Sequence, residues 1–230
     1  SSIWTAGPSP AEALQPAVGV KPGADEGMGL RVRELGEDAM ADKTLNVISI
    51  CGSLRKGSYN RIVMNALSGL APEGMQIKEA PPFSEFPLYN ADIQDSTGFP
   101  AAVMALADAI RAADGVIFVT PEYNFSIPGV LKNAIDWVSR VQNQPFAGKP
   151  IAIQSAADGI LGGGRMQYDL RRSVGSLNAL TLNRPEIFIG NCAQRIDEKT
   201  GQITDEQTKG FIKQQLAVFA KFIVAHGGKS

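Results

Sequence analysis

The sequence is poor in the residues from which many catalytic and metal sites are built. Among 230 residues there are one histidine, His226, and two cysteines, Cys51 and Cys192. One histidine near the C-terminus leaves almost nothing for histidine-based catalysis, and the cysteine spacing matches neither a disulfide framework nor a metal site. We therefore expect no bound metal and no nucleophilic cysteine. The scarcity of cysteine favours a cytoplasmic location.

Two further shortages narrow the class of protein. Lys and Arg number 22 against 23 for Asp and Glu, so the chain lacks the basic excess expected of a nucleic-acid-binding protein. No apolar run approaches the roughly 18–20 residues of a membrane span. With 44% hydrophobic residues, the chain can instead bury the core of one sizeable α/β domain.

The first 43 residues differ in composition from the rest. They are rich in Pro, Gly and Ala and show no hydrophobic periodicity, and they lack the basic and apolar regions of a signal peptide. The segment "MADKT", which begins at Met40, would make a plausible natural start. We expect residues 1–43 to be a poorly ordered leader or appended tail, and residues 44–230 to form the folded domain.

Beyond residue 44, short apolar runs alternate with amphipathic stretches. The apolar runs predict strands over residues 45–51, 75–80, 116–120, 151–155 and 186–189. Apolar residues spaced three to four apart predict helices over residues 58–70, 100–112, 128–140, 165–180 and from 204 to about 227. Ser126 is a candidate N-cap for the third helix, and "TDEQ" at 204–207 has the capping-box pattern. The alternation predicts a doubly wound parallel sheet.

Ligands of such sheets bind beyond the carboxyl ends of the strands, so the loops after Cys51, Thr120 and Ser155 are the candidate site. The first loop, "GSLRKGSYN", has the glycine separation of a Walker A motif, but Ser58 and Tyr59 stand where Lys and Ser/Thr belong. What remains suits a single phosphate at a helix N-terminus, with polar partners Ser53, Arg55, Ser58 and Asn60. The alternative is an ordinary turn capped by Ser58.

The other two loops suit a flat ring. "TPEYNFSIP" places Tyr123, Phe125 and Ile127 between two prolines, although a buried subunit contact would use the same residues. "SAADGILGGGR" contains four glycines that permit close backbone approach, and its spacing does not match G-x-G-x-x-G. The alternative here is a mobile surface loop. A phosphate, a linker and a planar heteroaromatic ring together describe FMN better than a dinucleotide.

Three segments also resemble a known family. "GSLRKGSYNR", "FPLYNAD" and "TPEYNFSIPGVLKNAIDWVSR" are similar to signatures of the NAD(P)H-dependent FMN reductases, above all of their chromate and quinone reductase branch. The similarity runs from about Leu45 to the C-terminal helix. It implies a flavodoxin-like five-stranded parallel sheet of order 2-1-3-4-5 with helices on both faces. It also implies non-covalently bound FMN, with NADPH or NADH as reductant.

The resemblance further implies which residues form the site. The first loop would bind the FMN phosphate through Ser53, Leu54, Arg55, Ser58, Tyr59 and Asn60. The isoalloxazine would lie against Pro121, Glu122, Tyr123 and Asn124, with Ser155 and Ala157 nearby and any contact at Ala157 made by the main chain. Members of the family are homodimers or homotetramers, and an interface network would use Arg165, Tyr168 and Glu186.

The implied mechanism needs no catalytic side chain, because the flavin carries the chemistry. NAD(P)H would pass a hydride to N5 of the flavin, and a quinone or an anion such as chromate would then be reduced at the same place. Arg165 is the candidate for attracting an anionic substrate. The alternatives are a flavodoxin-type electron carrier or a flavin-sensing domain without turnover. Carriers are usually strongly acidic, whereas residues 44–230 hold 18 basic and 16 acidic residues.

Overall fold

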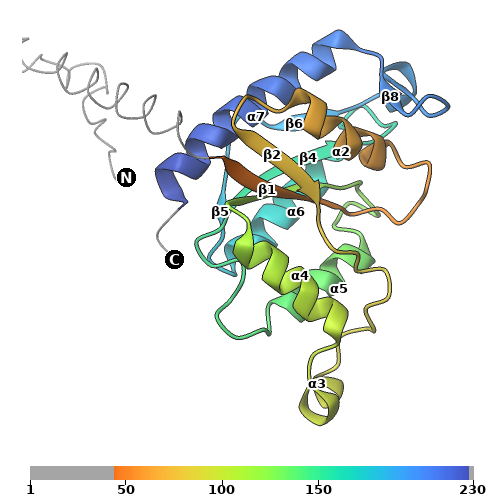
Figure 1. Cartoon of the computed structure of the whole chain (residues 1–230). Helices are drawn as coiled ribbons and strands as arrows, with labels where there is room; N and C mark the ends of the chain where they lie inside the picture. The colour runs from red at the N-terminus through yellow and green to blue at the C-terminus, as the bar shows by residue number, and fades with distance from the viewer. Residues whose placement is uncertain (1–43, 228–230) are drawn as a thin grey trace, which may run out of the picture. The chain divides into compact units, whose positions relative to one another are not determined.

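A parallel sheet forms the centre of the computed structural model, which describes residues 44–227 (Figure 1). Its strand order is β2-β1-β3-β4-β5, with β6 also paired to β4, and the predicted flavodoxin-like order is confirmed. The predicted leader, residues 1–43, lies outside the described residues. The strands are β1 (Leu45–Cys51), β2 (Met75–Glu79), β3 (Gly115–Val119), β4 (Pro150–Ala156), β5 (Leu180–Thr181) and β6 (Ile187–Ile189).

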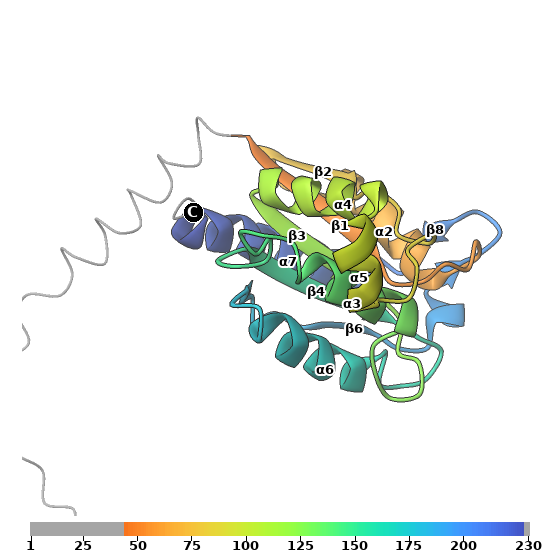
Figure 2. The same cartoon turned by 90° about the horizontal axis from the view of Figure 1, so that it is seen from below.

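Helices cover both faces of this sheet (Figure 2). One face carries α2 (Tyr59–Leu70) and α7 (Glu206–His226), and the other carries α4 (Ala101–Ala112), α5 (Gly129–Val138) and α6 (Gly164–Gly175). The short α3 (Ala91–Thr97) buries none of its residues. Every residue of β3 and β4 is buried, as expected of parallel strands covered on both sides.

Side chains of the central strands alternate between two cores. In β3, Ile117 and Val119 pack with α2 and α7, whereas Val116 and Phe118 pack with the helices of the other face. Strands β1, β3 and β4 are neighbours and run parallel. Their carboxyl ends therefore lie at one edge of the sheet, and the three candidate loops leave from that edge.

The edge strand is interrupted, which the sequence did not predict. Both β5 and β6 pair with β4, but the residues between them do not belong to the ladder. Side chains from the helices on both faces instead donate hydrogen bonds to carbonyls here: Arg171 to Leu182 and Gln215 to Pro185 within this segment, and Gln167 to Ile187 at the start of β6. These side chains satisfy backbone groups that would otherwise be buried without partners.

The helix predicted over residues 165–180 is too long. It ends at Gly175, and the chain then turns through Asn178, whose φ is 61°, so that Leu180 already belongs to β5. The apolar Leu177 continued the helical spacing and misled the prediction.

Both proposed caps are also wrong. The N-cap of α5 is Pro128, because Ser126 is hydrogen-bonded into a turn with Tyr123. The N-cap of α7 is Asp205, whose side chain accepts a hydrogen bond from the Thr208 N–H. A carboxylate at this position caps as well as a hydroxyl does, so the capping-box pattern started the helix one residue too early.

A small antiparallel hairpin, formed by β7 (Ile196–Asp197) and β8 (Gln202–Ile203), was also not predicted. It follows a 3₁₀ turn, η2 (Cys192–Gln194), and lies on the same side of the molecule as the loop after β1 (Figures 1 and 2). Within residues 44–227, none of the helices combines the length and the hydrophobicity that a membrane span would require.

Candidate functional site

The first and second loops meet where Gly52 faces Thr120. A Cβ atom on Gly52 would lie 1.9 Å from Thr120 Oγ1 and 2.5 Å from Thr120 Cβ. The Gly52 N–H also donates to the Val119 carbonyl at 3.0 Å. Glycine at this position therefore lets the ends of β1 and β3 approach closely, and it brings the two loops into contact.

Asn60 connects the first loop to β4. Its Nδ2 donates to the Ala156 carbonyl at 2.8 Å, and the Ala156 N–H donates to Asn60 Oδ1 at 2.9 Å. Asn60 is buried, so this pair of bonds is shielded from water. The side chain thus positions the start of α2 against the end of β4. Its predicted contact with a phosphate stays a prediction.

The start of α2 has no side-chain cap. Ser58 is the N-cap residue and only 2% exposed, but its side chain makes no capping hydrogen bond. The structure therefore does not show the ordinary Ser58-capped turn that was the alternative. The first N–H groups of a helix have no partners within it, and they attract negative charge. Ser53, in the same loop, is also buried and accepts a hydrogen bond from the Arg55 N–H at 3.3 Å.

The second loop is a tight turn held in an unusual conformation. Tyr123 and Ser126 exchange backbone hydrogen bonds of 3.1 and 3.0 Å, and the two residues between them, Asn124 and Phe125, have φ values of 49° and 67°. Positive φ is rare for a bulky residue such as phenylalanine, and residues held in such conformations cluster at functional sites. The turn leaves Phe125 66% exposed. The exposed rings of this loop are available to a flat ligand or to another subunit.

Glu122 joins the second loop to the third. The N-cap of α6 is Gly163, which has a φ of 86° and no side chain with which to cap the helix. Glu122 Oε2 accepts hydrogen bonds from the Arg165 and Met166 N–H groups at 3.0 and 3.2 Å. The carboxylate also pairs with the Arg165 guanidinium at 3.2 Å. Unlike α2, α6 thus has its N-terminus occupied by a carboxylate from the protein itself.

Arg165 is held by two partners. Besides its ion pair with Glu122, its guanidinium lies 4.2 Å from the centre of the Phe125 ring. Much of its charge is therefore compensated within the chain. Its predicted role in attracting an anionic substrate stays a prediction.

Replacing Glu122 with alanine should lower the free energy of unfolding by about 1–2 kcal/mol, because α6 loses its cap and Arg165 its partner. Urea unfolding measures the change. Glu122→Gln keeps an oxygen acceptor for the helix N–H groups and should recover part of the loss. Glu85→Ala, at an exposed position, is the matched control. Equal stabilities for the Glu122 and Glu85 alanine variants would show that the cap contributes nothing.

The third loop is fixed by a buried side chain that the sequence reasoning missed. Gln167 Nε2 donates to Ser155 Oγ at 2.8 Å, and Ser155 Oγ donates to the Gly162 carbonyl at 2.6 Å. Both groups of the Ala157 main chain are also engaged, by Ile189 and Cys192. The signal that could have identified Gln167 in the sequence is its polar side chain on the buried face of α6. These bonds argue against the freely mobile loop considered above.

A second missed residue lies at the first loop. Glu198, in the turn between β7 and β8, places its Oε1 3.7 Å from Arg55 Nη2. A hydrogen bond with Glu198 is the main reason why the pKa of Tyr59 is raised to about 12. No local pattern connects residues so far apart in the sequence.

Both cysteines are buried, and burial raises the pKa of Cys192 to about 12, which disfavours a thiolate at neutral pH.

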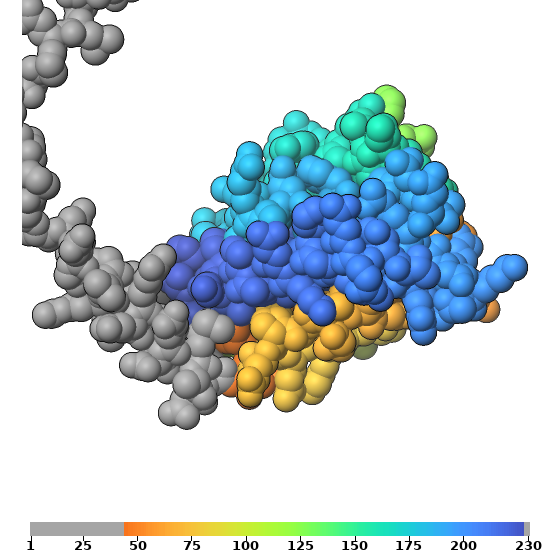
Figure 3. Space-filling model, turned by 90° about the horizontal axis from the view of Figure 1, so that it is seen from above, coloured from red at the N-terminus to blue at the C-terminus, as the bar shows by residue number. Residues whose placement is uncertain are grey.

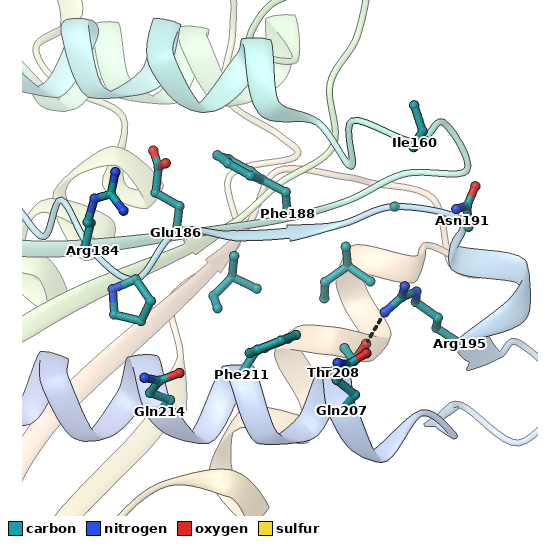
Figure 4. Close-up of a pocket in the computed structure, with 14 residues that line it drawn as sticks. Ile160, Arg184, Glu186, Phe188, Asn191, Arg195, Gln207, Thr208, Phe211 and Gln214 are labelled. Carbon is teal, nitrogen blue, oxygen red and sulfur yellow. Dashed lines mark hydrogen bonds between the residues drawn. The ribbon is translucent and has the colours of Figure 1, made fainter.

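A separate cavity of about 570 Å³ lies between β6 and α7 (Figure 4). Phe211 points from α7 toward β6, the Phe188 ring lies on the other side of β6, and Ile160 of the third loop lies at one end. None of the predicted FMN contacts lines this cavity. The candidate site at the three loops is therefore distinct from it.

The residues at the loops fit FMN. The uncapped N-terminus of α2, with the buried hydroxyls of Ser53 and Ser58, suits a phosphate monoester. Exposed apolar side chains near the same edge, Leu54 and Tyr123, suit the face of a ring system. The predicted ring contacts Pro121, Glu122 and Asn124 belong to the same loop as Tyr123. Hydrogen bonds connect the first loop to β4 and the second loop to the third. Which of these residues touch the cofactor stays a prediction.

The chain is similar to several known proteins. A family model described as NADPH-dependent FMN reductase matches residues 45–194. The quinone reductase of Escherichia coli (strain K12) is 48% identical over 184 residues, which cover 80% of this chain and 97% of that protein. An NAD(P)H-dependent FMN reductase of Pseudomonas aeruginosa is 47% identical over 172 residues, or 75% of this chain and 91% of that protein. Among solved structures, the chain is similar to FerB of Paracoccus denitrificans, which is described as a flavoenzyme NAD(P)H:(acceptor) oxidoreductase. The TM-score is 0.72 and the identity 33%, and the match covers 80% of this chain and all of that chain.

Proposed function

Because the chain belongs to the NADPH-dependent FMN reductase family, we propose that it binds FMN at the three loops and transfers electrons from NAD(P)H to quinones. It is an oxidoreductase, with FMN as cofactor and NAD(P)H as reductant. The observation that carries the placement of the cofactor is the start of α2, where a buried serine occupies the N-cap position and leaves the helix uncapped.

The chain's own residues would hold and orient the flavin. The first N–H groups of α2 and the hydroxyls of Ser53 and Ser58 would bind the phosphate, with Arg55 as the nearby cation. The turn at 123–126 and the third loop would border the ring. When bound, FMN supplies the chemistry: it accepts a hydride from NAD(P)H and returns two electrons to the acceptor. Because hydrogen bonds anchor the second and third loops, these loops would hold the ring in place.

The acceptor is the finer part of the proposal. Quinones are flat and suit a site bordered by exposed aromatic rings. An anion such as chromate would need positive charge near the ring, which Arg165 supplies only in part because Glu122 pairs with it. Since NAD(P)H and the acceptor would use the same open face, we propose that they react in turn, as in a ping-pong scheme.

We further propose that the chain assembles as a homodimer or homotetramer. Exposed rings gather around α6 and β6: Phe125, Tyr168 and Phe188. The Tyr168 hydroxyl donates to Glu186 at 3.4 Å on the same face. Aromatic residues of this kind are enriched in protein interfaces. Sedimentation equilibrium of the holoprotein measures the oligomeric state.

A visible spectrum of the purified protein, followed by anaerobic NADPH, tests the proposed function. We expect yellow protein with flavin absorption bands, rapid bleaching by NADPH, and recovery of colour on addition of a quinone or chromate. Yellow protein that neither NADPH nor NADH bleaches would indicate an electron carrier. Colourless protein that takes up no added FMN would refute the cofactor site.

A further inference from the structure

A carboxylate from a distant part of the chain lies against the first loop. The turn of the β7–β8 hairpin carries Glu198 to within 3.7 Å of Arg55, measured from Oε1 to Nη2. A Cβ atom on Gly57 would lie 3.6 Å from Glu198 Oε2. The loop and the hairpin lie together in both ribbon views, and the hairpin segment, in lighter blue, is at the surface beyond one end of α7 (Figures 1, 2 and 3). A negative charge thus borders the loop proposed to bind a phosphate.

Two side chains of the first loop interact with this carboxylate. Arg55 forms an ion pair with it, and Glu198 is the largest cause of the raised pKa of Tyr59. The Arg55 guanidinium also lies 5.8 Å from the centre of the Tyr59 ring. Glu198, Arg55 and Tyr59 therefore form one cluster at the entrance of the first loop.

The same guanidinium is the cation proposed to attract the FMN phosphate. A phosphate monoester carries nearly two negative charges at neutral pH. Arg55 that is paired with Glu198 has part of its charge compensated, and the carboxylate also repels an incoming phosphate. Both effects disfavour binding of the phosphate, and neither acts on a flavin that lacks one.

We propose that Glu198 competes with the FMN phosphate for Arg55 and thereby limits the preference of this protein for FMN over riboflavin. The inference rests on the proposed FMN site and adds a residue that determines its specificity. The effect is moderate, because the Arg55 and Glu198 side chains are 56% and 42% exposed and solvent screens their charges.

Flavin titrations of the full chain, freed of bound flavin, test the proposal. FMN and riboflavin are titrated separately, and quenching of their fluorescence gives the dissociation constants. In low salt, Glu198→Gln should bind FMN about threefold to tenfold more tightly than the wild type. Riboflavin should bind both proteins equally. The difference in FMN affinity between the two proteins should be smaller in roughly 0.5 M salt, because the Debye length is then only a few ångström.

Two further variants make the test specific. Glu73→Gln removes the same charge at an exposed position just before β2. Glu73 lies at the amino ends of the strands, whereas the first loop follows their carboxyl ends, so both dissociation constants should be unchanged. In an Arg55→Gln background, Glu198→Gln should have a clearly smaller effect, because the shared cation is gone.

Several results would overturn the proposal. They are an unchanged or weaker affinity of Glu198→Gln for FMN, an equal tightening for riboflavin, or an undiminished effect in the Arg55→Gln background. A weaker affinity would mean that the carboxylate supports Arg55 rather than competing for it. Failure of the wild type itself to bind FMN is a different result, which would refute the proposed function.

Discussion

Gly52→Ala is expected to be the most damaging single substitution at the site. The added Cβ would lie 1.9 Å from Thr120 Oγ1 and 2.5 Å from Thr120 Cβ. Rotation of the threonine side chain cannot relieve the second contact, because Cβ is fixed to the backbone of a fully buried residue. Strands β1 and β3 would have to separate. We expect the free energy of unfolding to fall by roughly 3 kcal/mol or more and FMN affinity to fall with it.

Chemical denaturation and FMN titration measure both effects. Gly69→Ala is the matched control, since a Cβ there meets no atom within 4 Å and the residue lies in α2. That variant should be stabilised by up to about 1 kcal/mol, because alanine is the better helix former. Should Gly52→Ala be insoluble, the double variant Gly52→Ala/Thr120→Gly can be measured instead. It should recover soluble, folded protein, since it removes the atoms that clash. Wild-type stability of Gly52→Ala would contradict the close approach.

The central sheet was predictable because strands that are buried on both faces consist almost entirely of apolar residues. Strands β1, β3 and β4 are nearly continuous apolar runs, and the observed bounds differ from the predicted ones by a residue at most at each end. The edge of the sheet was not predictable in the same way. There, Gln215 and Arg171 supply hydrogen bonds that the strand ladder lacks, and residue periodicity contains no information about such partners.

The candidate site was predictable in outline for the same physical reason. A parallel sheet brings the carboxyl ends of neighbouring strands together, so unusual loops after β1, β3 and β4 had to meet. The bonds between them were not predictable. That Glu122 lies at the flavin ring stays a prediction, but the hydrogen bonds by which its carboxylate caps α6 were not foreseen. Glu198 reaches the first loop only because the hairpin folds back onto it.

These bonds fix the loops of the candidate site. Glu122 holds the second loop to the start of α6, and Gln167 holds the third loop through Ser155. Ordering a loop costs conformational entropy, and a site whose loops are already ordered does not meet that cost when the ligand binds. The side chains that anchor the loops should therefore affect both stability and cofactor affinity.

Asn60 gives the sharpest test of this coupling. Asn60→Ala would leave the N–H and carbonyl groups of Ala156 buried without their partners. We expect the free energy of unfolding to fall by about 2–4 kcal/mol and the melting temperature by roughly 5–15 °C. FMN affinity should fall too, because the start of α2 is no longer fixed against β4. Asn65→Ala, on the exposed face of the same helix, should change stability by less than about 0.5 kcal/mol.

Asn60→Asp separates the hydrogen bonds from the size of the side chain. The carboxylate can still accept from the Ala156 N–H, but its second oxygen would face the Ala156 carbonyl, where the asparagine donates. Burial and this repulsion should raise the pKa of the introduced aspartate in the folded state above its unfolded value of about 4. The destabilisation is then complete at neutral pH and lessens as pH falls through the folded-state pKa, because the protonated acid again donates. A stability difference from wild type that does not change between about pH 7 and pH 5 would show that the two bonds do not hold the loop.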